Sequence, residues 1–163
     1  MTDKILKREK PNEVQETQRT LYYSSWLYSA IHILTSIPTF QVAPAIAEKL
    51  HLPVNAVINA LRDLVEMNLV QKEKEKYIHA GKDIYLPSEH PQCHSHHLNW
   101  RIRAVERAMI KEDVHYSNVF SISKKDLEIL RQQVVAFIEE QRKQVRASGT
   151  DIACVFCCDF FTL

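Results

Sequence analysis

The stretch LPVNAVINALRDLVEMNLV, residues 52–70, decides the fold. Its apolar residues recur every three or four positions, which is the spacing of one face of a helix. Asn68 then tolerates the left-handed conformation in which many helices end. The stretch therefore predicts a turn, a helix and the start of a strand, with one more helix before it. We predict that the two helices pack through the apolar residues Leu50, Val54, Val57, Ile58, Leu61 and Leu64.

The residues before this stretch predict further helices. Residues 22–36 carry apolar side chains at helical spacing and predict one amphipathic helix that ends before Pro38. Pro44 suits the first turn of a second helix, because its missing N–H needs no partner there. Pro53 begins the third helix, which we expect to run to about Met67.

A charged hairpin is expected after the third helix. Residues 69–80, LVQKEKEKYIHA, predict two short strands that meet at a tip in which lysine and glutamate alternate. Helices followed by such a hairpin are the outline of a winged helix-turn-helix, with the hairpin as its wing. This wing is polar, but its charges nearly cancel.

The C-terminal half predicts two more helices. Residues 81–91 have the composition of a linker, and Leu98 to Met109 keep the helical period. Ser123 resembles the start of a capping box, and the helix that it begins should end near Arg146, before Gly149.

The tail IACVFCCDFFTL, residues 152–163, predicts a terminal β-strand. Both of its sides are apolar, so we expect it to be covered on both faces. One cover is expected to be a second subunit, which predicts a homodimer. The fold class is thus mainly α: a winged helix-turn-helix over residues 21–86, then a helical C-terminal half over residues 91–163 with a terminal β-strand. Residues 1–20 are expected to be a flexible arm.

Composition indicates a folded cytoplasmic protein. Of the 163 residues, 45% are hydrophobic and 25% are charged, which is ordinary for a globular chain. The start lacks the apolar core of a signal peptide, and no apolar stretch is long enough to cross a membrane. We therefore expect no membrane association and expect the four cysteines to be reduced thiols.

The charge balance argues against a strongly basic module. Residues 1–88 contain 11 Lys and Arg against 10 Asp and Glu, and residues 89–163 contain 10 against 10, which accounts for the net charge of +1. Proteins that hold nucleic acid mostly do so through an excess of Lys and Arg.

Several segments resemble a family of uncharacterised bacterial proteins regarded as transcriptional regulators. The resemblance covers roughly residues 20–163 and rests on YYSSWLYSAIHIL (22–34), AIAEKL (45–50), AVINALRDLVEMNLV (56–70), HHLNWRIRAVERAM (96–109), SNVFSIS (117–123) and FCCDFFTL (156–163). It implies a winged-helix-like module with a role in transcription. Longer members of that family carry a separate repressor-like helix-turn-helix ahead of this region, for which this chain has no room.

The first functional hypothesis is a DNA-binding transcriptional regulator. A winged helix would lay residues 54–67 in the major groove, where Asn can pair with adenine and Arg with guanine. A typical DNA-binding protein makes about 6–10 phosphate contacts, so the wing and the arm would have to help. The residues predicted to contact DNA are Asn55, Asn59 and Arg62 on the helix and Lys72, Lys74 and Lys76 on the wing.

Two other hypotheses remain open. The second is a winged-helix module for dimerisation or protein–protein interaction, with a partner in the transcription machinery and no DNA. The third is a metal sensor at Cys93, His94 and His97, because Cys93 and His97 lie one helical turn apart and could share a zinc or copper ion.

Neither a cofactor nor an enzymatic activity is expected. Gly81 and Gly149 are the only glycines, so there is no phosphate-binding loop, and no paired-carboxylate or nucleophile motif is present.

Overall fold

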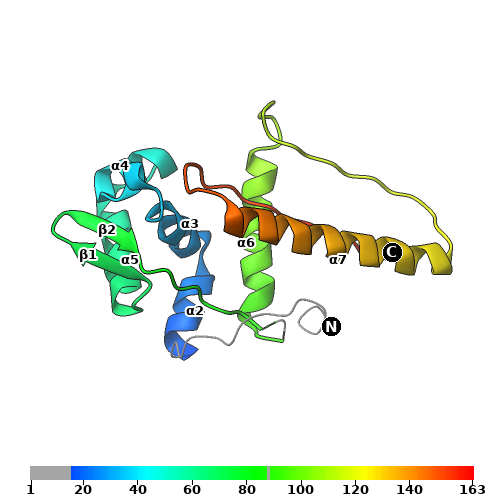
Figure 1. Ribbon diagram of the computed structural model, residues 1–163, viewed down its shortest axis with the longest axis horizontal. Helices are drawn as coiled ribbons and strands as arrows, with labels where there is room; N and C mark the ends of the chain where they lie inside the picture. The colour runs from blue at the N-terminus through cyan, green and yellow to red at the C-terminus, as the bar shows by residue number, and fades with distance from the viewer. Residues whose placement is uncertain (1–15, 88) are drawn as a thin grey trace.

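The computed structural model describes residues 16–87 and 89–163, and these residues are mainly helical (Figure 1). The predicted class, mainly α, is confirmed. The first elements are α2 (Glu16–Ser24), α3 (Trp26–Leu34), the short 3-10 helix η1 (Pro38–Phe40), α4 (Ala43–Leu50) and α5 (Val54–Glu66). They are followed by β1 (Val70–Glu73), β2 (Lys76–His79), α6 (Gln92–Glu106) and α7 (Lys124–Ala147).

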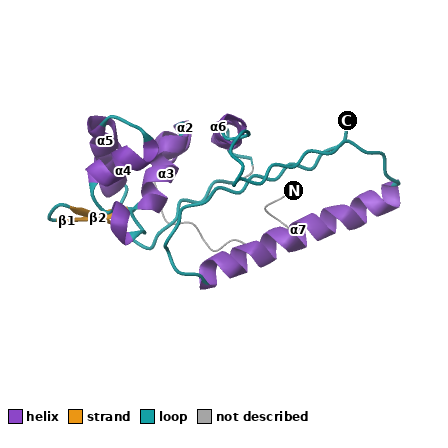
Figure 2. Cartoon of the chain, turned by 90° about the horizontal axis from the view of Figure 1, so that it is seen from above, coloured by secondary structure: helices purple, strands orange, loops and turns teal. Residues whose placement is uncertain are grey.

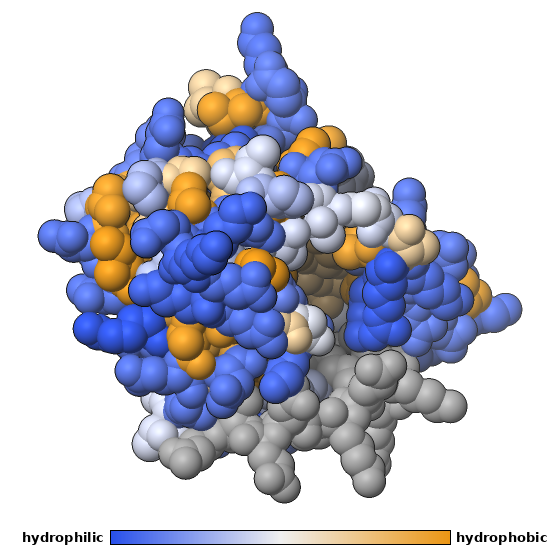
Figure 3. All heavy atoms as spheres, turned by 60° about the vertical axis from the view of Figure 1, so that its left-hand side comes forward, coloured by the Kyte–Doolittle hydropathy of each residue, from blue (hydrophilic) through white to orange (hydrophobic). Residues whose placement is uncertain are grey.

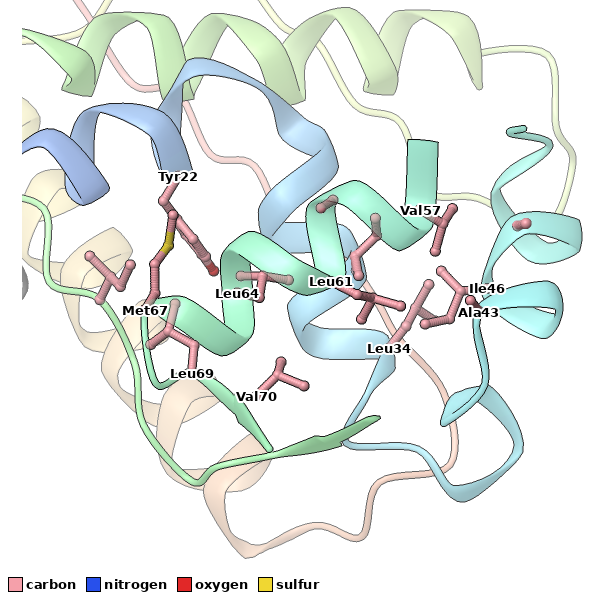
Figure 4. Close-up of a cluster of buried hydrophobic side chains, with 14 of the residues drawn as sticks. Tyr22, Leu34, Ala43, Ile46, Val57, Leu61, Leu64, Met67, Leu69 and Val70 are labelled. Atoms are coloured by element: carbon pink, nitrogen blue, oxygen red, sulfur yellow. The ribbon is translucent and has the colours of Figure 1, made fainter. Parts of the chain in front are cut away.

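Among the described residues, the buried hydrophobic side chains of the core all lie between Tyr22 and Leu86 (Figure 4). Helix α5 packs against both α3 and α4, and its residues Val57, Leu61 and Leu64 are fully buried. The helical spacing of residues 52–70 therefore predicted the packing face of α5. The prediction was wrong for Val54 and Ile58, which are 40% and 41% exposed, because the two packed helices cover only part of the circumference of α5.

The helix predicted over residues 22–36 is in fact two helices. Ser25 interrupts it with an extended backbone, and its hydroxyl accepts a hydrogen bond from the backbone N–H of Leu27 at 3.2 Å. Serine caps helices in this way, so Ser25 ends α2 and begins α3. The predicted flexible arm also needs correction, because α2 already begins at Glu16. Residues 1–15 of that arm lie outside the described residues.

Helices α4 and α5 end in the same motif. After α4, the N–H of Leu52 bonds the carbonyl of Ala47 at 2.9 Å, and that of His51 bonds Glu48 at 3.2 Å. After α5, the N–H of Leu69 donates to the carbonyl of Leu64, and the N–H of Asn68 donates to the carbonyl of Val65, in the same pattern. This is the Schellman motif, which requires one left-handed residue. His51 and Asn68 supply it with φ angles of 53° and 56°.

Replacing His51 with glycine is expected to raise the free energy of unfolding by roughly 0.5–1 kcal/mol. A left-handed conformation is costly for a residue with a Cβ atom, and glycine removes that cost. The His51 side chain is exposed, so little packing is lost. Asn68→Gly is the matched comparison and should gain less, because asparagine already tolerates this conformation. Urea denaturation of both variants checks the expectation, and an equal or larger gain from Asn68→Gly would contradict it.

The hairpin has the predicted extent and is docked on the helices. Strands β1 and β2 are antiparallel, with Val70 opposite His79 and Glu73 opposite Lys76. On the other edge of β2, the N–H of Tyr77 donates to Gln41 at 2.7 Å and that of His79 to Thr35 at 3.3 Å. The segment between α3 and α4 therefore covers an edge that would otherwise be open.

The C-terminal half contains the two predicted helices. Ser123 caps α7 as expected, its hydroxyl accepting from the N–H of Asp126 at 3.1 Å. Helix α6 packs on α2 and α3, whereas α7 belongs to none of the closely packed pairs of elements and lies apart from the α2–α5 group in Figure 2. Neither α6 nor α7 contains a buried residue.

The predicted terminal β-strand is wrong for the single chain. Residues 151–163 form no strand, and their backbone makes no hydrogen bond to the backbone of another described residue. A strand exists only when a neighbouring strand pairs with it, and this chain places none beside the tail. Phe137 of α7 is also 59% exposed.

Within the described residues, no helix combines the length and the apolar character that crossing a bilayer requires.

Candidate nucleic-acid interface

The outward face of α5 presents the three residues predicted to contact bases. Burial of Val57 and Leu61 against α3 and α4 fixes the rotation of the helix. Asn55, Asn59 and Arg62 then fall on one exposed stripe, because positions i, i+4 and i+7 share a helix face. The structure therefore brings these three side chains to one side of the helix.

Arg62 is the only cation of that stripe, and its guanidinium is exposed and forms only a long ion pair. Its side chain is 66% exposed, and its Nε lies 3.9 Å from the Asp63 carboxylate, at the limit of an ion pair. Asp63 instead accepts a hydrogen bond of 2.8 Å from the Tyr28 hydroxyl on α3. Burial and this bond raise the pKa of Tyr28 to about 12. Asp63 is thus held towards α3, which leaves Arg62 able to reach a ligand.

The hairpin lysines do not converge on one side. Lys72 lies opposite Tyr77, on the same hairpin face as the buried Val70, and its ammonium sits 5.5 Å from the centre of the Tyr77 ring. Lys76 lies opposite Glu73 and therefore on the other face. Lys74 occupies the tip with a φ of 55°. The wing thus offers three exposed cations that point in different directions.

The molecular face that carries the hairpin is mostly hydrophilic. Figure 3 shows separate hydrophobic patches among hydrophilic side chains on this face.

A buried polar cluster joins the hairpin to the helices, and sequence reasoning missed it. His32 on α3 is 1% exposed, its Nδ1 lies 3.0 Å from the Tyr22 hydroxyl, and its ring stacks on His79 of β2 with centroids 4.2 Å apart. Its neighbour Thr35 donates to the His32 carbonyl at 2.6 Å. A histidine in an apolar helix is a weak signal, and only the hairpin register brings His79 onto it.

Burial keeps this cluster uncharged. Desolvation, and then the nearby His79, lower the pKa of His32 to about 3, while the nearby backbone of Leu69 opposes them. Desolvation also lowers the pKa of His79, and burial raises the pKa of Tyr22. Tyr22 is therefore the donor and His32 Nδ1 the acceptor of their hydrogen bond.

The histidine-rich start of α6 does not assemble a metal site among the described residues. Cys93 packs against the hydrophobic core, whereas His94 and His97 line a shallow depression together with Leu98, Arg101 and Asp159. The three candidate ligands of the metal-sensor hypothesis are thus not gathered around one point.

Two further histidines, His90 just before α6 and His96 within it, contact α2. His90 Nε2 lies 2.5 Å from a carboxylate oxygen of Glu16, and the ring of His96 packs edge-on against Tyr23 at 4.8 Å. Burial, followed by His97 and Arg101, lowers the pKa of His96 to about 4. These residues anchor α6 on α2.

Comparison with known proteins gives one match. The profile of a family described as a domain of unknown function (DUF4423) matches residues 6–163. No curated protein and no solved structure matches the chain.

Proposed function

The chain belongs to the DUF4423 family, and since that family is described only as a domain of unknown function, we propose from the residues themselves that the protein is a DNA-binding transcriptional regulator of the winged-helix type. The observation that carries the proposal is the exposed stripe of Asn55, Asn59 and Arg62 on a helix held in place by two others.

The arrangement of elements supports a winged helix. Helices α3, α4 and α5 pack around one core, α4 and α5 are joined by a short turn at His51–Pro53, and a two-stranded hairpin follows directly. In helix-turn-helix proteins the second helix of the turn enters the major groove. In this proposal α5 is that recognition helix and residues 72–76 are the tip of the wing.

The stripe on α5 has the chemistry of base recognition. An asparagine amide can pair with both polar atoms of adenine, and a guanidinium with those of guanine. The exposed methyl groups of Val54 and Ile58 lie beside this stripe and could contact thymine methyl groups. The recognition helix would therefore read bases with amides, one guanidinium and apolar contacts.

The available cations limit the phosphate contacts. In one monomer, the proposed recognition helix and wing offer Arg62 and the lysines at positions 72, 74 and 76, and Glu73 and Glu75 lie between these lysines. Each phosphate neutralised adds about 0.9 to the salt slope of binding to duplex DNA. We therefore expect weaker salt dependence than for a strongly basic regulator, and a homodimer would double the number of contacts.

Replacing Arg62 with glutamine is expected to weaken DNA binding and to reduce the salt slope by about 1, because one phosphate or base contact loses its charge. Fluorescence anisotropy with a random duplex of about 30 base pairs, measured between about 50 and 200 mM salt, gives this slope. On a sequence selected from a random library, the same change should cost about 1–3 kcal/mol.

Arg131→Gln is the matched control for Arg62→Gln. Arg131 is an exposed arginine of α7, far from the recognition stripe in sequence, and is paired with Glu128 only at 3.7 Å. Its replacement should leave binding and slope unchanged. Equal losses from both variants would assign any binding to overall charge and would contradict a role for the α5 stripe.

One observation favours a second candidate, an interaction module that does not bind DNA. Val54 and Ile58 expose apolar surface beside the stripe of Asn55, Asn59 and Arg62, which also suits a protein partner in the transcription machinery. This candidate predicts no binding to duplex DNA at the lowest salt concentration. Salt-dependent binding that Arg62→Gln weakens would exclude it.

A further inference from the structure

The extended segments of the C-terminal half lack backbone partners. Residues 114–122 connect α6 to α7, and residues 151–163 form the tail. Neither segment makes a backbone hydrogen bond to the backbone of another described residue. Extended chain without backbone hydrogen bonds offsets little of the conformational entropy lost on ordering it, so pairing with a further strand would stabilise both segments.

Large apolar side chains are exposed along both segments. Six of them are between 54% and 94% exposed: Val114, Tyr116, Val119, Ile152, Val155 and Phe161. Taking about 200 Å² for each of the two aromatic side chains and about 100 Å² for each of the four aliphatic ones, they expose roughly 600 Å² of apolar surface. One side of a stable interface buries about 800 Å² in total, of which only a part is apolar. The exposed apolar area is therefore large enough for one side of such an interface.

The tail is nevertheless held in place by side chains. Arg101 of α6 donates to the Asp159 carboxylate through Nε at 2.7 Å and also through its terminal nitrogen. The Phe156 ring packs against Phe137 of α7 with centroids 5.9 Å apart. These contacts present the tail as an extended edge whose N–H and C=O groups remain open to another chain, as in β-strand addition.

We propose that the two extended segments, residues 114–122 and 151–163, form a homodimer interface in which those of one copy pair with those of a second copy. Charge supports a copy of the same chain as the occupant. Residues 107–163, which include both segments, contain eight Lys and Arg and eight Asp and Glu, so two copies meet without net repulsion. A nucleic acid or a strongly acidic partner would require a positive excess, which this region lacks. The proposal does not depend on DNA binding by α5.

The test measures association and backbone protection of the full chain. Sedimentation equilibrium at about 10 μM should give twice the chain mass of 19.0 kDa, since an interface of this size supports micromolar or tighter binding. In hydrogen exchange, the amides of residues 152–161 should exchange about 100-fold more slowly than in a single unpaired chain. This protection should be lost on dilution to the monomer.

A paired substitution locates the interface. Val119→Asp combined with Val155→Asp places charges at exposed positions, where a lone chain tolerates them, and should give a monomer with unprotected tail amides. Ile33→Asp combined with Val54→Asp is the control, because it changes two exposed apolar residues outside residues 107–163 and should remain dimeric. Circular dichroism confirms that both variants are folded.

Two results would overturn the proposal. One is a wild-type chain that sediments as a 19.0 kDa monomer, which would leave the surface to a different partner. The other is a wild-type dimer whose tail amides exchange as fast as those of the monomeric variant, which would place the contact elsewhere. If the double variant does not fold, hydrogen exchange of the wild-type chain diluted to the monomer replaces it as the reference for unprotected tail amides.

Discussion

Replacing Leu61 with alanine is expected to lower the free energy of unfolding by about 3–5 kcal/mol. Leu61 is fully buried on α5, the helix that packs against both α3 and α4, and Figure 4 shows it among Leu34, Ile46 and Leu64. Alanine loses the transfer free energy of the side chain and leaves a cavity that three helices cannot all close. Since single domains are stable by only about 5–15 kcal/mol, this change removes a large part of the total.

Ile58→Ala on the same helix is the control for Leu61→Ala. Ile58 lies one turn away and is 41% exposed, so it should cost about 1 kcal/mol or less. Urea denaturation of both variants measures the difference. Similar losses of unfolding free energy from the two substitutions would mean that the Leu61 side chain does not point into the core. The rotation of α5 would then be different, and Asn55, Asn59 and Arg62 would not form its outward stripe.

The sequence predicted best where one rule acts alone. The helical spacing of Val57, Leu61 and Leu64 and the left-handed preference of Asn68 fix the inward face and the end of α5 without any other part of the chain. The exposure of the α5 stripe follows from the same spacing. Alternating charge in residues 72–76 likewise predicted a hairpin tip.

Errors arose where two local preferences compete. The apolar period runs through Ser25 without interruption, yet its hydroxyl caps α3 and divides the helix. A capping serine is not visible in the apolar pattern, because a serine between apolar positions leaves the spacing of the apolar residues unbroken. Val54 and Ile58 fit an apolar stripe by spacing alone, but two packed helices cover only part of the circumference of α5.

Other features depend on residues distant in sequence and could not be predicted. The strand pairing sets Lys72 and Lys76 on opposite faces, because a hairpin register is fixed only when the turn position is known. The stacking of His32 on His79 needs that same register. The tail has the alternation of a strand, but pairing requires a second strand that the single chain does not supply.

Acid is expected to destabilise the protein between about pH 6.5 and pH 3, and His32 is the main cause. In the folded state the pKa of His32 is lowered to about 3, by burial first and by His79 second, whereas its ordinary value is 6.5. The unfolded chain therefore binds a proton in this range that the folded chain does not. The contribution of His32 is complete above pH 6.5 and is lost as the pH falls, at about 1.4 kcal/mol per pH unit, or about 2 kcal/mol by pH 5.

His79 and His96 add to this effect in the same direction, because burial lowers the pKa of each. His96 contributes less than its shift implies, since it is only partly buried and solvent screens its charge. The loss should begin at the hairpin, because a charge on either stacked ring repels the other and separates β2 from α3. Hydrogen exchange at pH 5 is expected to reveal opening of the amides of Tyr77 and His79 before those of α5.

His32→Gln separates titration from packing. Glutamine can still accept the hydrogen bond from the Tyr22 hydroxyl but has no proton to gain, so the variant should be less stable at pH 7 and should lose less stability between pH 7 and pH 5. The measurement is the free energy of unfolding in urea at several pH values. If His32→Gln keeps the full slope of the wild type, the buried pair is not the acid-sensitive element, and the docking of the hairpin on α3 would have to be stabilised by the backbone bonds of β2 to Thr35 and Gln41 instead.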